Sequence, residues 1–303
     1  MSHSRASTFV AGLGLLIAGY PFACAWEPRP DAVIAADIVR ADYEADLPLL
    51  LLLYHELPEP VGVTREASRI RYWRGFARWR RAINGLNDGA PVAQMLEDLQ
   101  IATREFDAAL TIAPEFVDAE AGLLSALGIQ LFLLNGDTAR MQPIIDRVRP
   151  MMTTLRSREP QHPRLLWVLG QAEWRTPAGW PKERVLAHQE RVIASYLHAL
   201  ELVRAQRIPS SDDLEPRWGE PELLMNLAWS NLNKVTPDLS AAERHAREAL
   251  RLVPHWHYVR DILLPQILEA KEESAQRPIA RALAPDWGTR IGVRPQCRNA
   301  DDA

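Results

Sequence analysis

The residues of this sequence that could bind a ligand fall mostly on segments with helical periodicity. One segment carries four arginines at successive spacings of three, four and three residues: Arg71, Arg74, Arg78 and Arg81. On a helix this spacing places the guanidinium groups on one face, where their forked N–H donors could bind a carboxylate or a phosphate. The alternative is a solvated face whose arginines pair with acidic residues of the next helical segment. The candidates for that pairing are Glu97, Asp98, Glu105 and Asp107.

A second polar set occupies positions i, i+4 and i+7 of another helical segment and consists of Asn226, Ser230 and Asn233. Asparagine and serine are unfavourable inside a helix because their side chains compete for backbone hydrogen bonds. Their presence indicates a hydrogen-bonding role, either with a ligand or with neighbouring helices and water.

Two histidines that follow this segment in the sequence suggest a metal site, because His255 and His257 lie close to Asp261. On a helix that begins at Pro254, however, the two imidazoles point roughly 200° apart. His257 and Asp261 share a face, so we expect a hydrogen-bonded pair and no metal. A metal-dependent hydrolase would require side chains to converge from a wider set. That set is His245, His255, His257, Glu220 and Asp261.

The sequence contains ten tryptophans, several of them in its C-terminal half. Trp174, Trp229 and Trp256 could line an aromatic groove, although large aromatic side chains more often fill the core between helices. There is no GxSxG, GxxxxGK or CxxC motif. We therefore expect a non-enzymatic protein without a cofactor.

Residues 218–267 show which elements position these side chains. Apolar residues recur at helical spacing from Leu223 to Ala228, a turn follows at Pro237, and a second apolar stripe ends at Pro254. This pattern predicts two antiparallel helices joined by a short turn. The second stripe consists of Ala242, Ala246, Ala249, Leu250 and Leu252.

The order of small and apolar residues before Pro254 resembles the second helix of a tetratricopeptide repeat. Similar patterns occur in residues 102–114 and 192–200. The resemblance is to the tetratricopeptide-repeat (TPR-like) superfamily, and within it to uncharacterised secreted bacterial proteins. It implies an all-α fold, a right-handed superhelical solenoid of antiparallel helical hairpins, in which asparagines of the first helices contact the ligand. The repeats are longer than the standard 34 residues, because units close at spacings of 46, 44 and 50 residues. Those closing positions are Pro114, Pro160, Arg204 and Pro254.

The chain begins with an expected signal peptide at residues 1–25, in which a short apolar run precedes Ala23 and Ala25. Cleavage after Ala25 would deliver the protein to the periplasm or beyond; lipidation of Cys24 is the alternative. We expect a helix and linker over residues 26–63, with the helix interrupted at Pro48. The TPR-like domain covers residues 64–276, and an irregular tail covers 277–303. Cys297 in this tail is either a free thiol or the site of a disulfide between chains.

The formal charge of −4 argues against nucleic acid as a partner. No transmembrane segment is expected in the mature chain. The leading hypothesis is an exported scaffold that binds a protein or peptide in its concave groove. One alternative is a periplasmic helper of solute transport that binds a small molecule among the C-terminal tryptophans, and the other is the metal-dependent hydrolase. The oligomeric state stays open.

Overall fold

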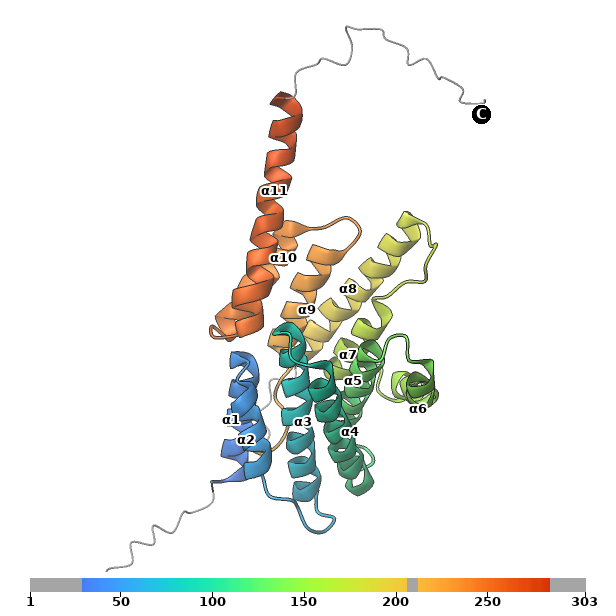
Figure 1. Ribbon diagram of the computed structural model, residues 1–303, viewed down its shortest axis with the longest axis vertical. Helices are drawn as coiled ribbons and strands as arrows, with labels where there is room; N and C mark the ends of the chain where they lie inside the picture. Colours follow the sequence, from blue (N-terminus) through green and yellow to red (C-terminus); the bar gives the residue numbers. More distant parts are fainter. Residues whose placement is uncertain (1–28, 206–211, 284–303) are drawn as a thin grey trace, which may run out of the picture.

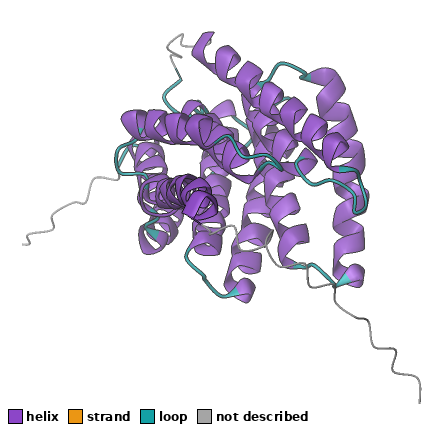
Figure 2. Cartoon of the chain, turned by 90° about the horizontal axis from the view of Figure 1, so that it is seen from above, coloured by secondary structure: helices purple, strands orange, loops and turns teal. Residues whose placement is uncertain are grey.

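The computed structural model describes residues 29–205 and 212–283, and within these ranges every regular element is a helix (Figure 1, Figure 2). The helices form five successive hairpins, which confirms the predicted all-α architecture. The hairpins are α1 (Asp31–Glu44) with α2 (Leu47–Glu56), α3 (Arg65–Asn87) with α4 (Val92–Ile112), α5 (Val117–Leu133) with α6 (Thr138–Arg158), α7 (Pro163–Glu173) with α8 (Lys182–Ala205), and α9 (Glu220–Asn233) with α10 (Leu239–Leu252). A π-helical turn, η1 (Tyr258–Leu263), then leads into α11 (Leu264–Leu283), which extends beyond the stack in Figure 1.

Small residues bring the two helices of a hairpin close together, as the resemblance implies. Ala102 and Ala109 of α4 are fully buried, and the Phe106 ring between them lies against Gly75 of α3. A Cβ atom at Gly75 would lie 3.0 Å from that ring, which is tighter than most side-chain contacts, so the close approach favours glycine there. The fifth hairpin is packed by fully buried alanines of α10, namely Ala242, Ala246 and Ala249.

Side-chain caps define where several helices begin. The carboxylates of Asp46, Asp137 and Asp238 accept hydrogen bonds from backbone N–H groups in the first turns of α2, α6 and α10. The Thr64 hydroxyl accepts in the same way from Ala67 at the start of α3. Each cap satisfies an N–H group that has no partner inside the helix.

Two helix boundaries differ from those expected. The N-terminal region contains two helices, because Ala45 adopts a left-handed conformation with φ of 56° and Asp46 caps the second helix. Pro48 lies in the first turn of α2, where its missing N–H costs no hydrogen bond. Helix α11 reaches Leu283, beyond the expected end of the helical domain at residue 276.

The expected signal peptide with Cys24, and Cys297 of the tail, lie outside the described residues. Within the described ranges no helix is both long and apolar enough to cross a bilayer.

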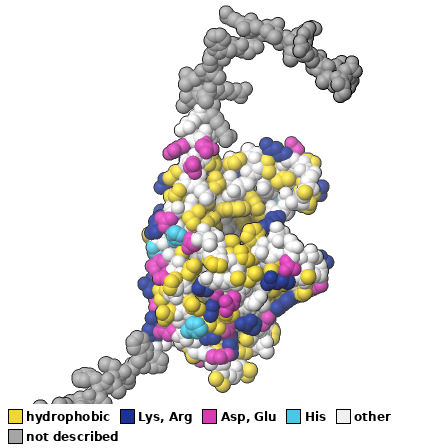
Figure 3. All heavy atoms as spheres, viewed as in Figure 1, with side chains coloured by type: hydrophobic (Ala, Val, Ile, Leu, Met, Phe, Trp, Pro, Cys, Tyr) yellow, Lys and Arg dark blue, Asp and Glu magenta, His cyan; other side chains and the backbone are white. Residues whose placement is uncertain are grey.

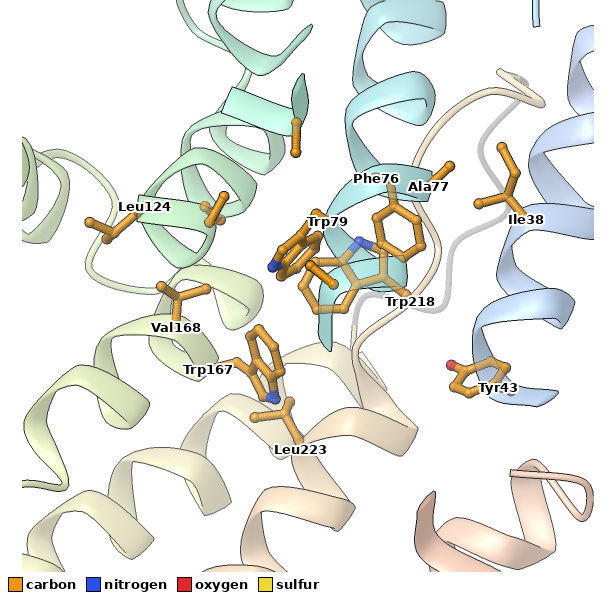
Figure 4. Close-up of a cluster of buried hydrophobic side chains, with 14 of the residues drawn as sticks. Ile38, Tyr43, Phe76, Ala77, Trp79, Leu124, Trp167, Val168, Trp218 and Leu223 are labelled. Atoms are coloured by element: carbon orange, nitrogen blue, oxygen red, sulfur yellow. The ribbon is translucent and has the colours of Figure 1, made fainter. Parts of the chain in front are cut away.

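The inner face of the stack is filled by aromatic side chains from distant parts of the chain (Figure 4). The segment before α9 crosses α3, where the Trp73 indole donates to the carbonyl of Leu214 over 2.8 Å. The Trp218 indole likewise donates to the Tyr72 hydroxyl over 2.7 Å. The continuous open groove of a simple solenoid is therefore largely occupied here by the protein itself.

The first hairpin also meets the last. The Tyr43 ring of α1 packs edge-on against Trp256, with 5.0 Å between ring centroids. The Tyr43 hydroxyl hydrogen-bonds to Glu222 of α9. Contacts in an open solenoid link neighbouring repeats only, so these contacts form a seam that closes the stack.

Candidate functional site

A cavity of about 280 Å³ lies between α3, α7, α8, α9 and the turn η1, and we call it the central cavity. Its apolar wall consists of Ile83, Trp167, Trp174, Tyr196, Met225, Trp229, Trp256 and Tyr258. Its polar wall consists of Arg80, Asn84, Asn87, Gln171, Arg175, Asn226 and Ser230. The space-filling view shows a hollow near the middle of the molecule, with hydrophobic side chains gathered around it (Figure 3).

The three tryptophans expected to form an aromatic groove all line this cavity. Trp174 and Trp229 are half-buried and meet edge-to-face, with 5.5 Å between ring centroids. Trp256 is only 2% exposed, since it also packs against Tyr43 across the seam. The proline-rich segment after α7, residues 175–181, begins beside Trp174 and contributes Arg175 to the cavity wall.

The polar set of α9 is divided by the structure. Asn226 and Ser230 line the cavity, whereas Asn233 lies outside it and its Nδ2 donates to the carbonyl of Trp229 over 2.9 Å. Asn226 is 6% exposed, and its Nδ2 has no hydrogen-bond partner of normal geometry. The neighbouring Tyr196 hydroxyl is also buried, which raises its pKa, while the Asn226 side chain acts in the opposite direction. The Asn226 amide nitrogen thus makes no hydrogen bond of normal geometry, and the Tyr196 hydroxyl is the polar group beside it.

Arg80 supplies a buried cation at this site, with 3% exposure. Its Nε lies 2.7 Å from a carboxylate oxygen of Asp42, and the Asn84 side chain donates to the other oxygen over 2.9 Å. Burial alone would lower the pKa of Arg80, but Asp42 outweighs it and the pKa is raised. Across the described residues, the terminal nitrogens of Arg80 donate no hydrogen bond to the protein.

Glu222 of α9 lies near Arg80 and is almost completely buried. Its two oxygens accept hydrogen bonds from the Tyr43 hydroxyl and the backbone N–H of Gly219, each over 2.8 Å. Burial raises the pKa of Glu222, and the nearby Arg80 only partly offsets that effect.

The arginine face of α3 lies elsewhere and is neutralised by α4. The carboxylate of Glu105 holds Arg71 and Arg74, each over 2.9 Å. Asp98 holds Arg78 over 2.8 Å and also pairs with Arg81. The pairing agrees with the alternative considered from the sequence, but the arginines are largely buried and not solvated. None of the candidates Arg71, Arg74 and Arg78 lines the central cavity.

His257 and Asp261 form the expected pair, with 2.9 Å between Nδ1 and the carboxylate. The other imidazole nitrogen lies 3.1 Å from Asp88, in the turn between α3 and α4. Burial opposes the charge on His257, but the two carboxylates outweigh it and raise its pKa. No cluster of three or more potential metal ligands occurs in the part of the chain that the structure describes.

Several cavity residues carry no signal in the sequence. Arg80 falls outside the spacing of the arginine face, and Tyr258 enters the cavity from a π-helical turn. Met225 and Arg175 do not belong to a recognisable sequence motif either. Their convergence depends on contacts between distant helices.

No protein-family model matches this chain. No curated protein matches it. Among solved structures, the chain is similar to a thermophilic TPR protein from Thermus thermophilus. The match has 16% sequence identity and a TM-score of 0.42, and it covers 79% of this chain and 100% of that chain. The chain's own structure shows antiparallel helical hairpins packed by small residues.

Proposed function

We propose that this protein is an exported, non-enzymatic helical-repeat scaffold that binds a small molecule in the central cavity. The observation that carries the proposal is the convergence of Trp174, Trp229 and Trp256 around a cavity of about 280 Å³. Small-molecule sites are typically concave, mostly apolar and furnished with a few polar groups, with volumes from roughly 300 Å³ upwards. The cavity is slightly smaller than the lower limit of that range, which suits a ligand of one or two rings.

The composition of the cavity wall supports binding over catalysis. Among the described residues its wall includes no aspartate, glutamate, histidine or cysteine, so Ser230 and the tyrosines face the space without a carboxylate or imidazole base to activate them. The buried tyrosine Tyr196 has a raised pKa and is a weak acid there. A binding protein that delivers or senses a solute is consistent with this wall.

A second candidate is a scaffold for a protein or peptide partner, a common role of helical repeats. One observation favours it. Phe132 at the end of α5 is 47% exposed, and the guanidinium of Arg175 lies 5.2 Å from its ring centroid. Apolar surface therefore continues outwards from the cavity, and a peptide could insert one side chain and cross Phe132.

The two candidates are separated by a thermal-shift screen against small apolar and aromatic compounds and against a peptide library. Ligands that bind the folded state raise its melting temperature. We expect small-molecule hits whose effect disappears in Trp229→Ala. The matched control is Trp180→Ala, because Trp180 packs on Arg184 and His188 and does not line the cavity. Hits from peptides alone would favour the second candidate, and hits unaffected by Trp229→Ala would place the site elsewhere.

Export is supported by the apolar run at residues 9–19 and by the small residues at 23–25. N-terminal sequencing of the protein recovered from its native host tests this part. Trp26 as the first residue would support cleavage after Ala25, whereas a blocked, lipid-modified Cys24 would support the anchored form. An intact Met1 would contradict both.

A further inference from the structure

The charged side chains that line the central cavity are arginines. Arg80 and Arg175 both line it, and no carboxylate of the described residues does. An aromatic box such as Trp174, Trp229 and Tyr258 would by itself attract a cation. The two guanidinium groups oppose that preference, so the wall favours a ligand that is flat, apolar and negatively charged.

Two donors of the wall have no acceptor in the protein. The Asn226 amide nitrogen is buried without a hydrogen-bond partner of normal geometry, and the terminal nitrogens of Arg80, which are not themselves buried, make no hydrogen bond within the described residues. Buried donors without a partner are rare in native proteins and call for an explanation. A ligand carboxylate has two oxygens that can accept from a guanidinium fork and an amide together.

Arg175 adds a cation at the outer part of the cavity. Its side chain is exposed, and its guanidinium lies over the face of the Phe132 ring. It has no ion pair among the residues that the structure describes. A cation placed there raises the local concentration of anions at the entrance.

The turn η1 completes the aromatic wall. Trp256 lies just before this π-helical turn, and Tyr258 is its first residue. Single π-helical turns occur frequently at functional sites. Tyr258 of this turn and Trp256 just before it add two flat rings to a space that Trp174 and Trp229 bound from the other hairpins.

We infer that the ligand of the central cavity is a small aromatic carboxylate, whose ring packs among the tryptophans and whose carboxylate accepts from Arg80 and Asn226. This inference rests on the proposed small-molecule function and specifies its ligand class. Arg175 is a steering residue at the entrance.

Three naphthalene probes of nearly equal shape test the charge preference by calorimetry at low salt: 2-naphthoate, 2-naphthamide and 2-naphthylmethylammonium. Since hydrogen bonds to charged groups are the stronger class, we expect 2-naphthoate to bind about tenfold more tightly than 2-naphthamide. The ammonium probe should bind most weakly. Arg175→Gln should weaken 2-naphthoate binding by about threefold and leave 2-naphthamide unchanged, because its effect is electrostatic. Arg184→Gln, on α8 but outside the cavity, should change neither.

Asn226→Leu is the second variant, since leucine has the same number of side-chain heavy atoms and the same branching at Cγ but no hydrogen-bonding group. It should lower 2-naphthoate affinity by about fivefold or more. Equal binding of the three probes, or tighter binding of the ammonium, would overturn the charge assignment. An unaltered 2-naphthoate preference in both variants would place the carboxylate elsewhere and overturn the residue assignment. If no probe binds, the aromatic carboxylate is wrong; the proposed function then fails as well only if the wider screen yields no hit that depends on Trp229.

Discussion

The hydroxyl of Tyr43 donates a 2.8 Å hydrogen bond to the carboxyl of Glu222, although the two residues are 179 positions apart in the chain. Both side chains are buried, and the bond lies at the seam between the first and fifth hairpins. Burial raises the pKa values of Tyr43 and Glu222. Each group therefore depends on the other to satisfy its polar atoms away from water.

Tyr43→Phe should lower the free energy of unfolding by about 1–3 kcal/mol, because it leaves a buried Glu222 oxygen without its donor. Urea unfolding measures the loss. Tyr54→Phe is the control: Tyr54 also donates to a glutamate, but it is half-buried and Glu105 keeps Arg71 and Arg74. An equal loss in both variants would contradict a special role for the seam.

Glu105→Gln should destabilise the protein by about 3–5 kcal/mol, since it leaves the largely buried Arg71 and Arg74 without their shared carboxylate. Ligand binding in the central cavity should not change, because none of these residues lines it. Unfolding and calorimetry on the same variant separate the two effects. A loss of binding in folded Glu105→Gln protein would make the arginine face a candidate ligand site again.

Gly170→Ala should destabilise the protein by about 1–3 kcal/mol, because the added methyl would collide with the Tyr196 ring. Tyr196 lines the cavity, so ligand affinity should fall as well. Gly128→Ala is the matched control on α5: no atom lies within 4 Å of the added methyl, and alanine should stabilise the helix by about 0.5–1 kcal/mol. Thermal unfolding of the pair checks the opposite signs.

His257 should make stability depend on pH. Its pKa is raised above 6.5 in the folded state by Asp261 and Asp88, so its contribution is complete below pH 6.5 and declines as pH rises through the folded pKa. The pKa of Asp261 is lowered to about 2, chiefly by Arg260 and then by His257, so this carboxylate stays ionised. Wild type should therefore be more stable than His257→Gln at pH 5.5, by less than about 1 kcal/mol for this exposed site, and the difference should narrow by pH 8. The exposed His198→Gln controls for the general loss of a histidine; a constant difference across this range would contradict the expectation.

The hairpins could be predicted from sequence because their determinants are local. Buried alanines at helical spacing, such as Ala242 and Ala246, specify one helix face, and a proline follows the unit. The seam between Tyr43 and Glu222 could not be predicted, since no local pattern relates residues so far apart. The break after Glu44 was also missed: it depends on a left-handed alanine, whereas Pro48 was the stronger sequence signal.

The candidate site could be predicted only in part, because helical spacing is local whereas the partners of each face come from distant helices. The spacing of Arg71, Arg74 and Arg78 correctly placed them on one face, but spacing does not reveal whether that face meets water, a ligand or carboxylates. Asn226 and Ser230 share a face with one another and enter the cavity, whereas Asn233 is one turn further and bonds its own helix. Whether these residues bind a ligand stays a prediction.

The seam has a consequence for how this protein can evolve. An open stack of repeats can gain or lose an internal hairpin by duplication or deletion, because each repeat contacts only its neighbours. Here the first hairpin must meet the last, so an extra unit would separate Tyr43 from Glu222 and from Trp256. The copy number is therefore fixed by geometry, and new specificity has to arise by substitution around the enclosed space.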